Sequence, residues 1–174
     1  GLTSIYLNMS DDNGVTWQED TLISDTQYLN MYQDFEVDNQ GNLHLVYYNY
    51  AANYDLEDVR YRFSEFGNTG FTESITLGAV TDDMEPCDCC QSTMVTDGNN
   101  RVFLLFRNDD NNVRNTYIAK STDGGLSFTD TEDLDDVNWI LTSCPTSSPV
   151  GAIYNDSVMV IRRNGGTGVN EIYK

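Results

Sequence analysis

Ser10-Asp11-Asp12-Asn13-Gly14-Val15-Thr16-Trp17 and Ser121-Thr122-Asp123-Gly124-Gly125-Leu126-Ser127-Phe128 share one pattern, Ser-x-Asp-x-Gly-x-x-aromatic. Their serines lie 111 positions apart, which is two periods of about 56 residues. A weaker copy, Ser64–Phe71, lies between them and keeps only the serine and the aromatic residue. Self-similarity at a fixed period is typical of repeat architectures, so we expect the chain to be built from one repeated unit.

Other residues follow the same period. Tyrosines recur at steps of 55, 56 and 56, at Tyr6, Tyr61, Tyr117 and Tyr173. A short apolar run bounded by Asp, Asn and Gly precedes the last three, at Asn42–Tyr47, Arg101–Phe106 and Ser157–Arg162. Such runs are typical of β-strands, and no stretch shows apolar residues at helical spacing with caps. We therefore predict an all-β chain.

Each unit has room for four antiparallel strands, A (innermost) to D (outermost), which is one blade of a β-propeller. Strand B is the apolar run, strand C carries the tyrosine, and strand D follows the Ser-x-Asp turn, for example at Thr21–Ile23 and Ser74–Leu77. Strand A is predicted at Asp34–Asp38, Ser92–Asp97 and Val150–Tyr154.

The whole chain, 1–174, then forms a partial propeller of about three blades, with repeat units roughly at 6–60, 61–116 and 117–172. Propellers close with about 4–8 blades. We therefore expect either half of a six-bladed ring, completed by the remainder of a longer chain, or a ring assembled from further copies.

The two full turns have predicted structural roles. The serine and aspartate are expected to cap backbone N–H groups, the glycine to adopt a positive φ, and the aromatic residue to pack under the hairpin. The residues concerned are Ser10, Asp12, Gly14 and Trp17 in the first turn, and Ser121, Asp123, Gly125 and Phe128 in the second.

The composition is that of a globular, strongly acidic protein, with 39% hydrophobic residues, a net charge of −19 and a pI near 4.1. Nucleic acid and anionic membrane surfaces attract basic patches, so this charge argues against both as partners. No apolar run is long enough for membrane insertion. The acidic turns keep a β surface soluble; alternatively, Asp109–Asn112 or Asp82-Asp83 binds Ca²⁺.

The turn motif resembles the Asp-box of sialidase-type (BNR-repeat) propellers. Cys87-Asp88-Cys89-Cys90, Phe106-Arg107-Asn108, the second turn and Cys144-Pro145 together resemble a group of secreted bacterial propellers described as sialidase-like or exo-α-sialidase. The resemblance implies an extracellular or cell-surface location. It is specific for fold rather than for function, because the same hairpin occurs in glycosidases, lectins, adhesins and receptors.

Aligning the units places Tyr48, Arg107 and Arg163 at one equivalent position, the end of strand B, on the face opposite the Ser-x-Asp turns. The resemblance implies that the arginines hold a substrate carboxylate and that Tyr48 stands where the family has its tyrosine nucleophile. The chain lacks an Arg-Ile-Pro motif, a third equivalent arginine and a glutamate paired with Tyr48. The alternative is that the arginines bridge to acidic neighbours such as Asp109.

Four cysteines, Cys87, Cys89, Cys90 and Cys144, make up a second candidate site. One interpretation is disulfides between neighbouring blades, for example Cys87 or Cys90 with Cys144. The alternatives are a thiolate site for copper or zinc, and free thiols. A vicinal Cys89–Cys90 disulfide is disfavoured by strain, and the single histidine, His44, is assigned to packing rather than ligation.

Two functional hypotheses follow. In the first, the chain is an extracellular binding or scaffold module, stabilised near its axis by the cysteines, for a glycan or another protein. In the second, it is part of an exo-sialidase-like glycoside hydrolase that acts on acidic sugars.

Overall fold

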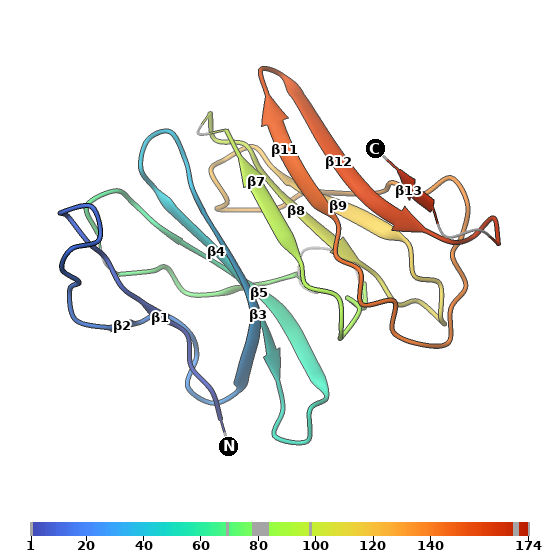
Figure 1. Cartoon of the computed structure of the whole chain (residues 1–174), viewed down its shortest axis with the longest axis horizontal. Helices are drawn as coiled ribbons and strands as arrows, with labels where there is room; N and C mark the ends of the chain where they lie inside the picture. Colours follow the sequence, from blue (N-terminus) through green and yellow to red (C-terminus); the bar gives the residue numbers. More distant parts are fainter. Residues whose placement is uncertain (1, 69, 78–83, 98, 169–170, 174) are drawn as a thin grey trace.

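The computed structural model describes residues 2–68, 70–77, 84–97, 99–168 and 171–173, which form thirteen β-strands (Figure 1). The strands are β1 (Tyr6–Leu7), β2 (Thr21–Leu22), β3 (Leu29–Val37), β4 (Leu43–Tyr50), β5 (Leu56–Ser64), β6 (Ile75–Thr76), β7 (Thr93–Thr96), β8 (Val102–Arg107), β9 (Thr116–Ser121), β10 (Asp130–Asp133), β11 (Val150–Tyr154), β12 (Ser157–Asn164) and β13 (Glu171–Tyr173).

The strands pair into four antiparallel sheets in chain order: β1-β2, β3-β4-β5-β6, β7-β8-β9-β10 and β11-β12-β13. The apolar runs form β4, β8 and β12, and the equivalent tyrosines lie on the strand that follows each of them. The register repeats in the last two sheets, where the equivalent residues Phe106 and Arg162 pair with Tyr117 and Tyr173. In the second sheet it is shifted by one residue, since Val46 rather than Tyr47 pairs with Tyr61. The prediction of an all-β chain is therefore confirmed.

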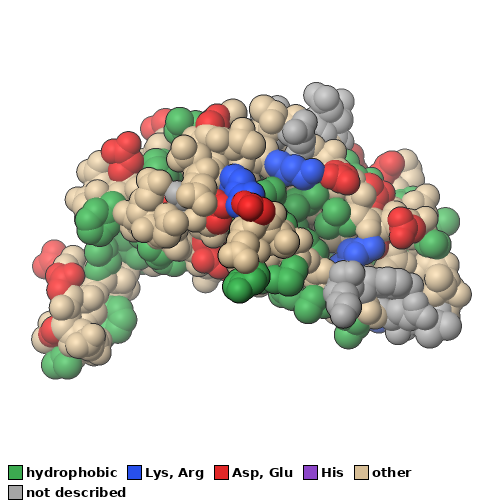
Figure 2. All heavy atoms as spheres, turned by 90° about the horizontal axis from the view of Figure 1, so that it is seen from above, with side chains coloured by type: hydrophobic (Ala, Val, Ile, Leu, Met, Phe, Trp, Pro, Cys, Tyr) green, Lys and Arg blue, Asp and Glu red, His purple; other side chains and the backbone are tan. Residues whose placement is uncertain are grey.

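The first strands of successive sheets lie side by side, with β7 in contact with β3 and with β11. The Met94 N–H of β7 donates to the Asp34 carboxylate of β3 over 2.9 Å, and the Thr93 hydroxyl donates to the Pro149 carbonyl over 3.1 Å. Figure 2 shows the resulting arched outline of the molecule. Across the described residues the four sheets form an open arrangement, and no closed ring is present.

The apolar core lies between the sheets, so a strand is buried on one face or on both according to its neighbours. All of β8 is buried: Leu104 and Phe106 join the core shared with β4 and β5, whereas Phe103 and Leu105 join the core shared with β11 and β12. In β12, by contrast, exposed and half-buried residues alternate, since only one face is covered.

The two full Ser-x-Asp turns make the same hydrogen bonds. The serine Oγ accepts from the glycine N–H over 2.8 Å in both, at Gly14 and at Gly125. The aspartate Oδ1 accepts from the N–H four residues on, over 2.8 Å at Asp12 and 2.9 Å at Asp123. Both glycines have positive φ, at 83° and 88°.

The aromatic residues of the two turns differ. Phe128 is 6% exposed and packs edge-to-face on Tyr61 of the preceding sheet, with 5.0 Å between ring centroids. Trp17 is 63% exposed, so its expected packing under the hairpin is wrong for this turn. The reason is positional: β1-β2 is the first sheet, and none of the described residues forms a sheet before it.

Candidate functional site

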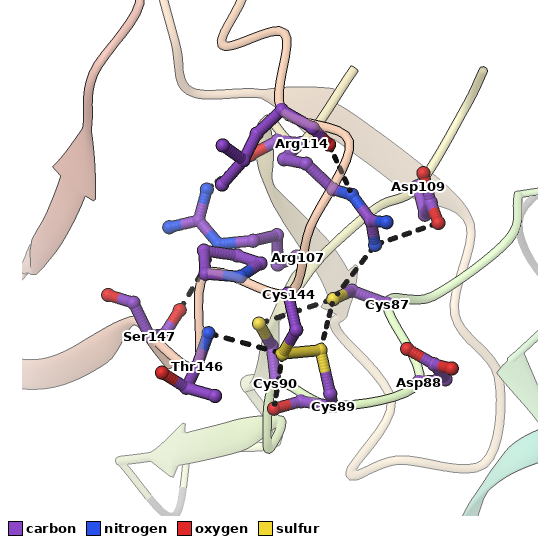
Figure 3. The surroundings of a disulfide bond; sticks show 12 residues. Cys87, Asp88, Cys89, Cys90, Arg107, Asp109, Arg114, Cys144, Thr146 and Ser147 are labelled. Atoms are coloured by element: carbon purple, nitrogen blue, oxygen red, sulfur yellow. Dashed lines mark hydrogen bonds and ion pairs between the residues drawn. A yellow bond between two sulfur atoms is a disulfide. The ribbon is translucent and has the colours of Figure 1, made fainter. Parts of the chain in front are cut away.

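The sequence-predicted arginines and cysteines meet where three connecting segments come together, at residues 84–92, 108–115 and 137–149 (Figure 3). Backbone hydrogen bonds join the segments. The Cys87 N–H donates to the Arg107 carbonyl over 2.7 Å, and the Arg114 N–H donates to the Trp139 carbonyl over 2.8 Å. The first bond extends the antiparallel pairing beyond the ends of β7 and β8, and the second extends it beyond the ends of β9 and β10.

A disulfide joins Cys89, in the segment before β7, to Cys144, in the segment before β11, with 6.2 Å between their Cα atoms. A link between neighbouring sheets is therefore present, but the example pairings of Cys87 or Cys90 with Cys144 are wrong. Cys87 and Cys90 turn into the protein and are fully buried, whereas Cys89 and Cys144 face the surface. The disulfide between the two segments therefore joins the surface-facing pair.

Cys87 and Cys90 are free thiols whose sulfur atoms lie 3.2 Å apart. The Cys87 sulfur also lies 3.5 Å from the Cys89 sulfur and accepts a hydrogen bond from Arg114 Nη1 over 3.2 Å. The hydrogen bond between Cys87 and Cys90 lowers the pKa of the Cys87 thiol; burial opposes this effect, and the Cys89 N–H and Arg114 reinforce it. The same hydrogen bond, together with burial, raises the pKa of Cys90.

Arg107 is a buried structural residue in this arrangement, with an exposed fraction of 0%. Its guanidinium donates to three backbone carbonyls: to Ser147 from Nε over 3.1 Å, to Arg163 from Nη2 over 2.8 Å, and to Arg114 from Nη1. In this arrangement the Arg107 guanidinium is engaged with backbone carbonyls and is not presented to a substrate carboxylate. The alternative partner Asp109 is wrong for Arg107, since Asp109 pairs with Arg114 over 2.7 Å.

Arg163 is brought next to Arg107, as the alignment of the units predicts. The two guanidinium groups stack on the Trp139 ring, at 4.9 Å for Arg107 and 5.3 Å for Arg163. Arg163 is half-buried and donates to the Pro145 carbonyl over 3.3 Å. Cation–π stacking and carbonyl contacts thus hold Arg107 in the interior and Arg163 beside it at a half-buried position.

Tyr48 is fully buried and points at the cysteine segment, so it lacks the exposure that a nucleophile needs. Its hydroxyl donates to the Cys90 carbonyl over 2.6 Å and lies 2.8 Å from the Ser92 hydroxyl. Burial raises the pKa of Tyr48 far above its ordinary value, which disfavours the phenolate. Tyr50 acts in parallel by donating to the Asp88 carbonyl over 2.5 Å. Two tyrosines of β4 therefore fix the backbone of the cysteine segment.

Two residues at the centre of the site, Arg114 and Trp139, were missed by the sequence reasoning. Both lie in irregular connections, where the 56-residue period gives no alignment. A usable signal existed for Trp139, because it is one of two tryptophans and lies five residues before Cys144.

A cleft of about 380 Å³ opens beside the cysteine segment, on the same face. It is lined by the β4–β5 turn, by the segment before β7 and by Asp109 after β8. Six of the ten lining residues carry carboxylates, and no lining residue is basic; they are Asp55, Glu57, Asp58, Glu85, Asp88 and Asp109. An anionic ligand would be repelled by this lining.

The candidate Ca²⁺ turns do not gather ligands in the described part of the chain. In the turn Asp109–Asn112, Asp109 is paired with Arg114 and Asp110 accepts from the Asn111 amide. Asp82-Asp83 lies outside the described residues. Among the residues that the structure describes, the only group of three His, Cys, Asp or Glu ligand atoms within 4.8 Å of one another is Cys87, Cys89 and Cys90.

Comparison with known proteins identifies a fold but no family. No protein-family model matches the chain, and no curated protein matches its sequence. A crystal structure of a variant of NanB sialidase from Streptococcus pneumoniae matches with a TM-score of 0.52 and 12% identity, over 94% of this chain and 24% of that one. A second NanB structure, with a bound ligand, gives a TM-score of 0.48 and 11% identity, over 98% of this chain and 27% of that one.

The chain thus spans about a quarter of the length of these sialidases. At 12% identity the likeness shows a sialidase-like β fold only. In addition, no described helix is long and apolar enough to cross a membrane.

Proposed function

We propose that these residues are part of a sialidase-like, Asp-box β-propeller that serves as an extracellular binding or scaffold module, with cysteines fixing its centre. Three features support the propeller: the 56-residue period, the meander order of the sheets, and the contacts of β7 with both β3 and β11. The fold of NanB sialidase agrees with it. The Cys89–Cys144 disulfide supports an oxidising, extracellular compartment.

The contacts of Arg107 are the main reason for proposing a binding module rather than a hydrolase. A sialidase-type site needs guanidinium groups that converge on a substrate carboxylate. The Arg107 guanidinium instead donates to three backbone carbonyls at 0% exposure. The neighbouring Tyr48 hydroxyl is bonded to the Cys90 carbonyl in the same interior. Releasing either side chain toward a ligand would leave buried carbonyls without donors.

The acidic cleft supports the same choice and suggests the ligand class. Its lining carries six carboxylates and no basic side chain. Like charges a few ångströms apart repel more strongly at a partly desolvated surface than in water, so a sialic acid is disfavoured there. A neutral glycan or a basic segment of another protein suits this lining.

Exposed apolar residues at both ends of the arc support the need for further blades. The first sheet exposes Tyr6 and Leu22, and the last exposes Val150, Met159 and Ile161. An uncovered sheet face of this kind marks an interaction surface. We assign it to the remainder of the same chain, or to further copies that complete the ring.

The test is hydrolysis of a fluorogenic sialoside by the full-length protein, with Arg163→Ala as the site variant and Tyr54→Ala, in the acidic cleft, as its control. We expect no turnover above that of heat-inactivated protein. Turnover that is abolished by Arg163→Ala and retained by Tyr54→Ala would overturn the proposal and establish the glycoside hydrolase. Retained melting temperatures show that both variants fold.

A further inference from the structure

The four cysteines form two unequal pairs, and the sulfur of Cys87 lies in contact with both its own partner and the other pair. Cys89–Cys144 is an oxidised pair at the surface, while Cys87 and Cys90 are a reduced pair in the interior. The Cys87 sulfur lies 3.2 Å from the Cys90 sulfur and 3.5 Å from the Cys89 sulfur. It is therefore in contact with the second thiol and with the disulfide at once (Figure 3).

The surroundings of Cys87 favour its thiolate, which is the form that attacks disulfides. Arg114 Nη1 donates to the Cys87 sulfur over 3.2 Å, and Asp109 holds that guanidinium over 2.7 Å. The Cys87 and Cys90 sulfur atoms lie within hydrogen-bonding distance of each other, at 3.2 Å, so a proton can pass between the two groups. Burial lowers the pKa of the neighbouring Arg107, and the charges of Cys90, Asp135 and Cys87 oppose this effect.

We propose that Cys87 and Cys90 are a redox-active dithiol that exchanges with the Cys89–Cys144 disulfide, and that Cys87 is the attacking sulfur. The Cys87 thiolate attacks the Cys89 sulfur, forming a Cys87–Cys89 bond and expelling the Cys144 thiolate. The Cys90 proton passes to Cys144, and the Cys90 thiolate then attacks Cys87. The products are a Cys87–Cys90 disulfide, a Cys89 thiolate and a Cys144 thiol.

The exchange is balanced without an oxidant, because one disulfide breaks for each that forms. Two electrons move from the buried dithiol to the surface pair. Cys144 is exposed and Cys89 half-exposed, whereas the exposed fractions of Cys87 and Cys90 are 0% and 1%. Among the four cysteines, the surface pair is the one that an external reactant can reach.

The external substrate class is a disulfide. The Cys89 thiolate attacks it, a mixed disulfide forms with loss of one thiol, and Cys144 then displaces the second thiol to restore Cys89–Cys144. The net reaction oxidises Cys87 and Cys90 to a disulfide and reduces the external disulfide to two thiols. This activity is independent of the proposed binding function, since it uses neither the acidic cleft nor any glycan.

The experiment uses oxidised glutathione as the probe and the full-length protein, isolated under anaerobic conditions. We expect two equivalents of reduced glutathione per chain, and peptide mapping after acid quench should find both Cys89–Cys144 and Cys87–Cys90. The control is a Cys89→Ser, Cys144→Ser double variant, which keeps the buried pair but loses the relay. It should release glutathione at least tenfold more slowly.

A second variant, Cys90→Ser, stops the sequence after the first step and should accumulate a Cys87–Cys89 bond with an alkylatable Cys144. Three results would overturn the proposal: oxidation of the double variant at the wild-type rate, Cys87 that stays reduced under excess oxidised glutathione, or stoichiometric Cu(I) or Zn²⁺ that protects all four cysteines. The last result would favour a metal site. Retained near-ultraviolet circular dichroism shows that each variant is folded.

Discussion

Replacing Arg107 by methionine should destabilise the fold rather than change only the chemistry of an exposed site. Methionine retains much of the apolar volume of the side chain but has no donor. The change leaves the carbonyls of Ser147, Arg114 and Arg163 without their N–H partners in the interior. A buried acceptor without a partner costs about 1–3 kcal/mol.

Three such carbonyls would cost up to about 9 kcal/mol, but water that enters from the side of the half-buried Arg163 reduces this cost. We therefore expect a loss of about 3–6 kcal/mol in the free energy of unfolding, a large part of the about 5–15 kcal/mol of a typical domain. Arg107→Lys should rescue little, since an ammonium group does not reproduce the planar fork of donors.

The assay is urea unfolding monitored by tryptophan fluorescence, because Trp139 stacks on the guanidinium at 4.9 Å and reports on this region. The matched control is Arg163→Met. Its parent side chain stacks on the same ring but is only half-buried, so we expect a loss below about 1.5 kcal/mol. An Arg107→Met protein within about 0.5 kcal/mol of wild type in unfolding free energy would refute a structural role for this arginine.

Three further changes probe the disulfide and the turns. Cys144→Ala opens the Cys89–Cys144 link, which closes 55 residues, and should lower the unfolding free energy by about 4 kcal/mol in denaturant melts. Gly125→Ala should cost at least about 1–3 kcal/mol by the same measurement, because φ is 88° and the new Cβ would clash with the Tyr61 hydroxyl. Hydrogen bonds led by the Thr16 hydroxyl lower the pKa of Asp12 from 3.8 to about 2, so its stabilisation is complete above pH 3.8 and disappears as the pH falls through about 2. Melting temperatures measured from pH 5 to pH 2 should fall less steeply in Asp12→Asn.

Each of these changes has a control. Gly67 has φ of 79° and nothing within 4 Å of an added Cβ, so Gly67→Ala carries the backbone strain without the clash. Equal losses for the two glycine variants would contradict the packing argument. For Cys144→Ala, adding a reductant should bring the unfolding free energy of wild type down to that of the variant. A difference in unfolding free energy that persists under reductant would mean that loss of the disulfide is not its cause. If the melting temperature of Asp12→Asn falls with pH as steeply as that of wild type, the assignment of this pH dependence to Asp12 is contradicted.

The strands were predictable because their signals are local and periodic. An apolar run with turn residues on both sides specifies β8, and the tyrosine 11 residues after Phe106 specifies the pairing partner β9. The position of Arg107 at the end of β8 was also predictable. Its burial was not predictable, because the sequence of an apolar strand that ends in arginine is the same whether the guanidinium faces a ligand or backbone carbonyls.

The cysteine pairing was not predictable for a related reason. Cys87 to Cys90 lie in an irregular segment, where the alternation of a strand does not decide which side chain faces inward. Contacts distant in the sequence decide it: Tyr48 and Tyr50 hold the Cys90 and Asp88 carbonyls. The exposure of Trp17 also depends on distant contacts, since Phe128 is covered by Tyr61 of another sheet and none of the described residues covers Trp17 in this way.

The most direct test of the cysteine-fixed centre is peptide mapping of the unreduced protein, alkylated and digested at low pH so that disulfide exchange is stopped. The predicted result is a single cross-linked peptide pair in which Cys144 is joined to Cys89. Cys144 joined to Cys87 or Cys90, or a fully alkylatable Cys144, would contradict this account.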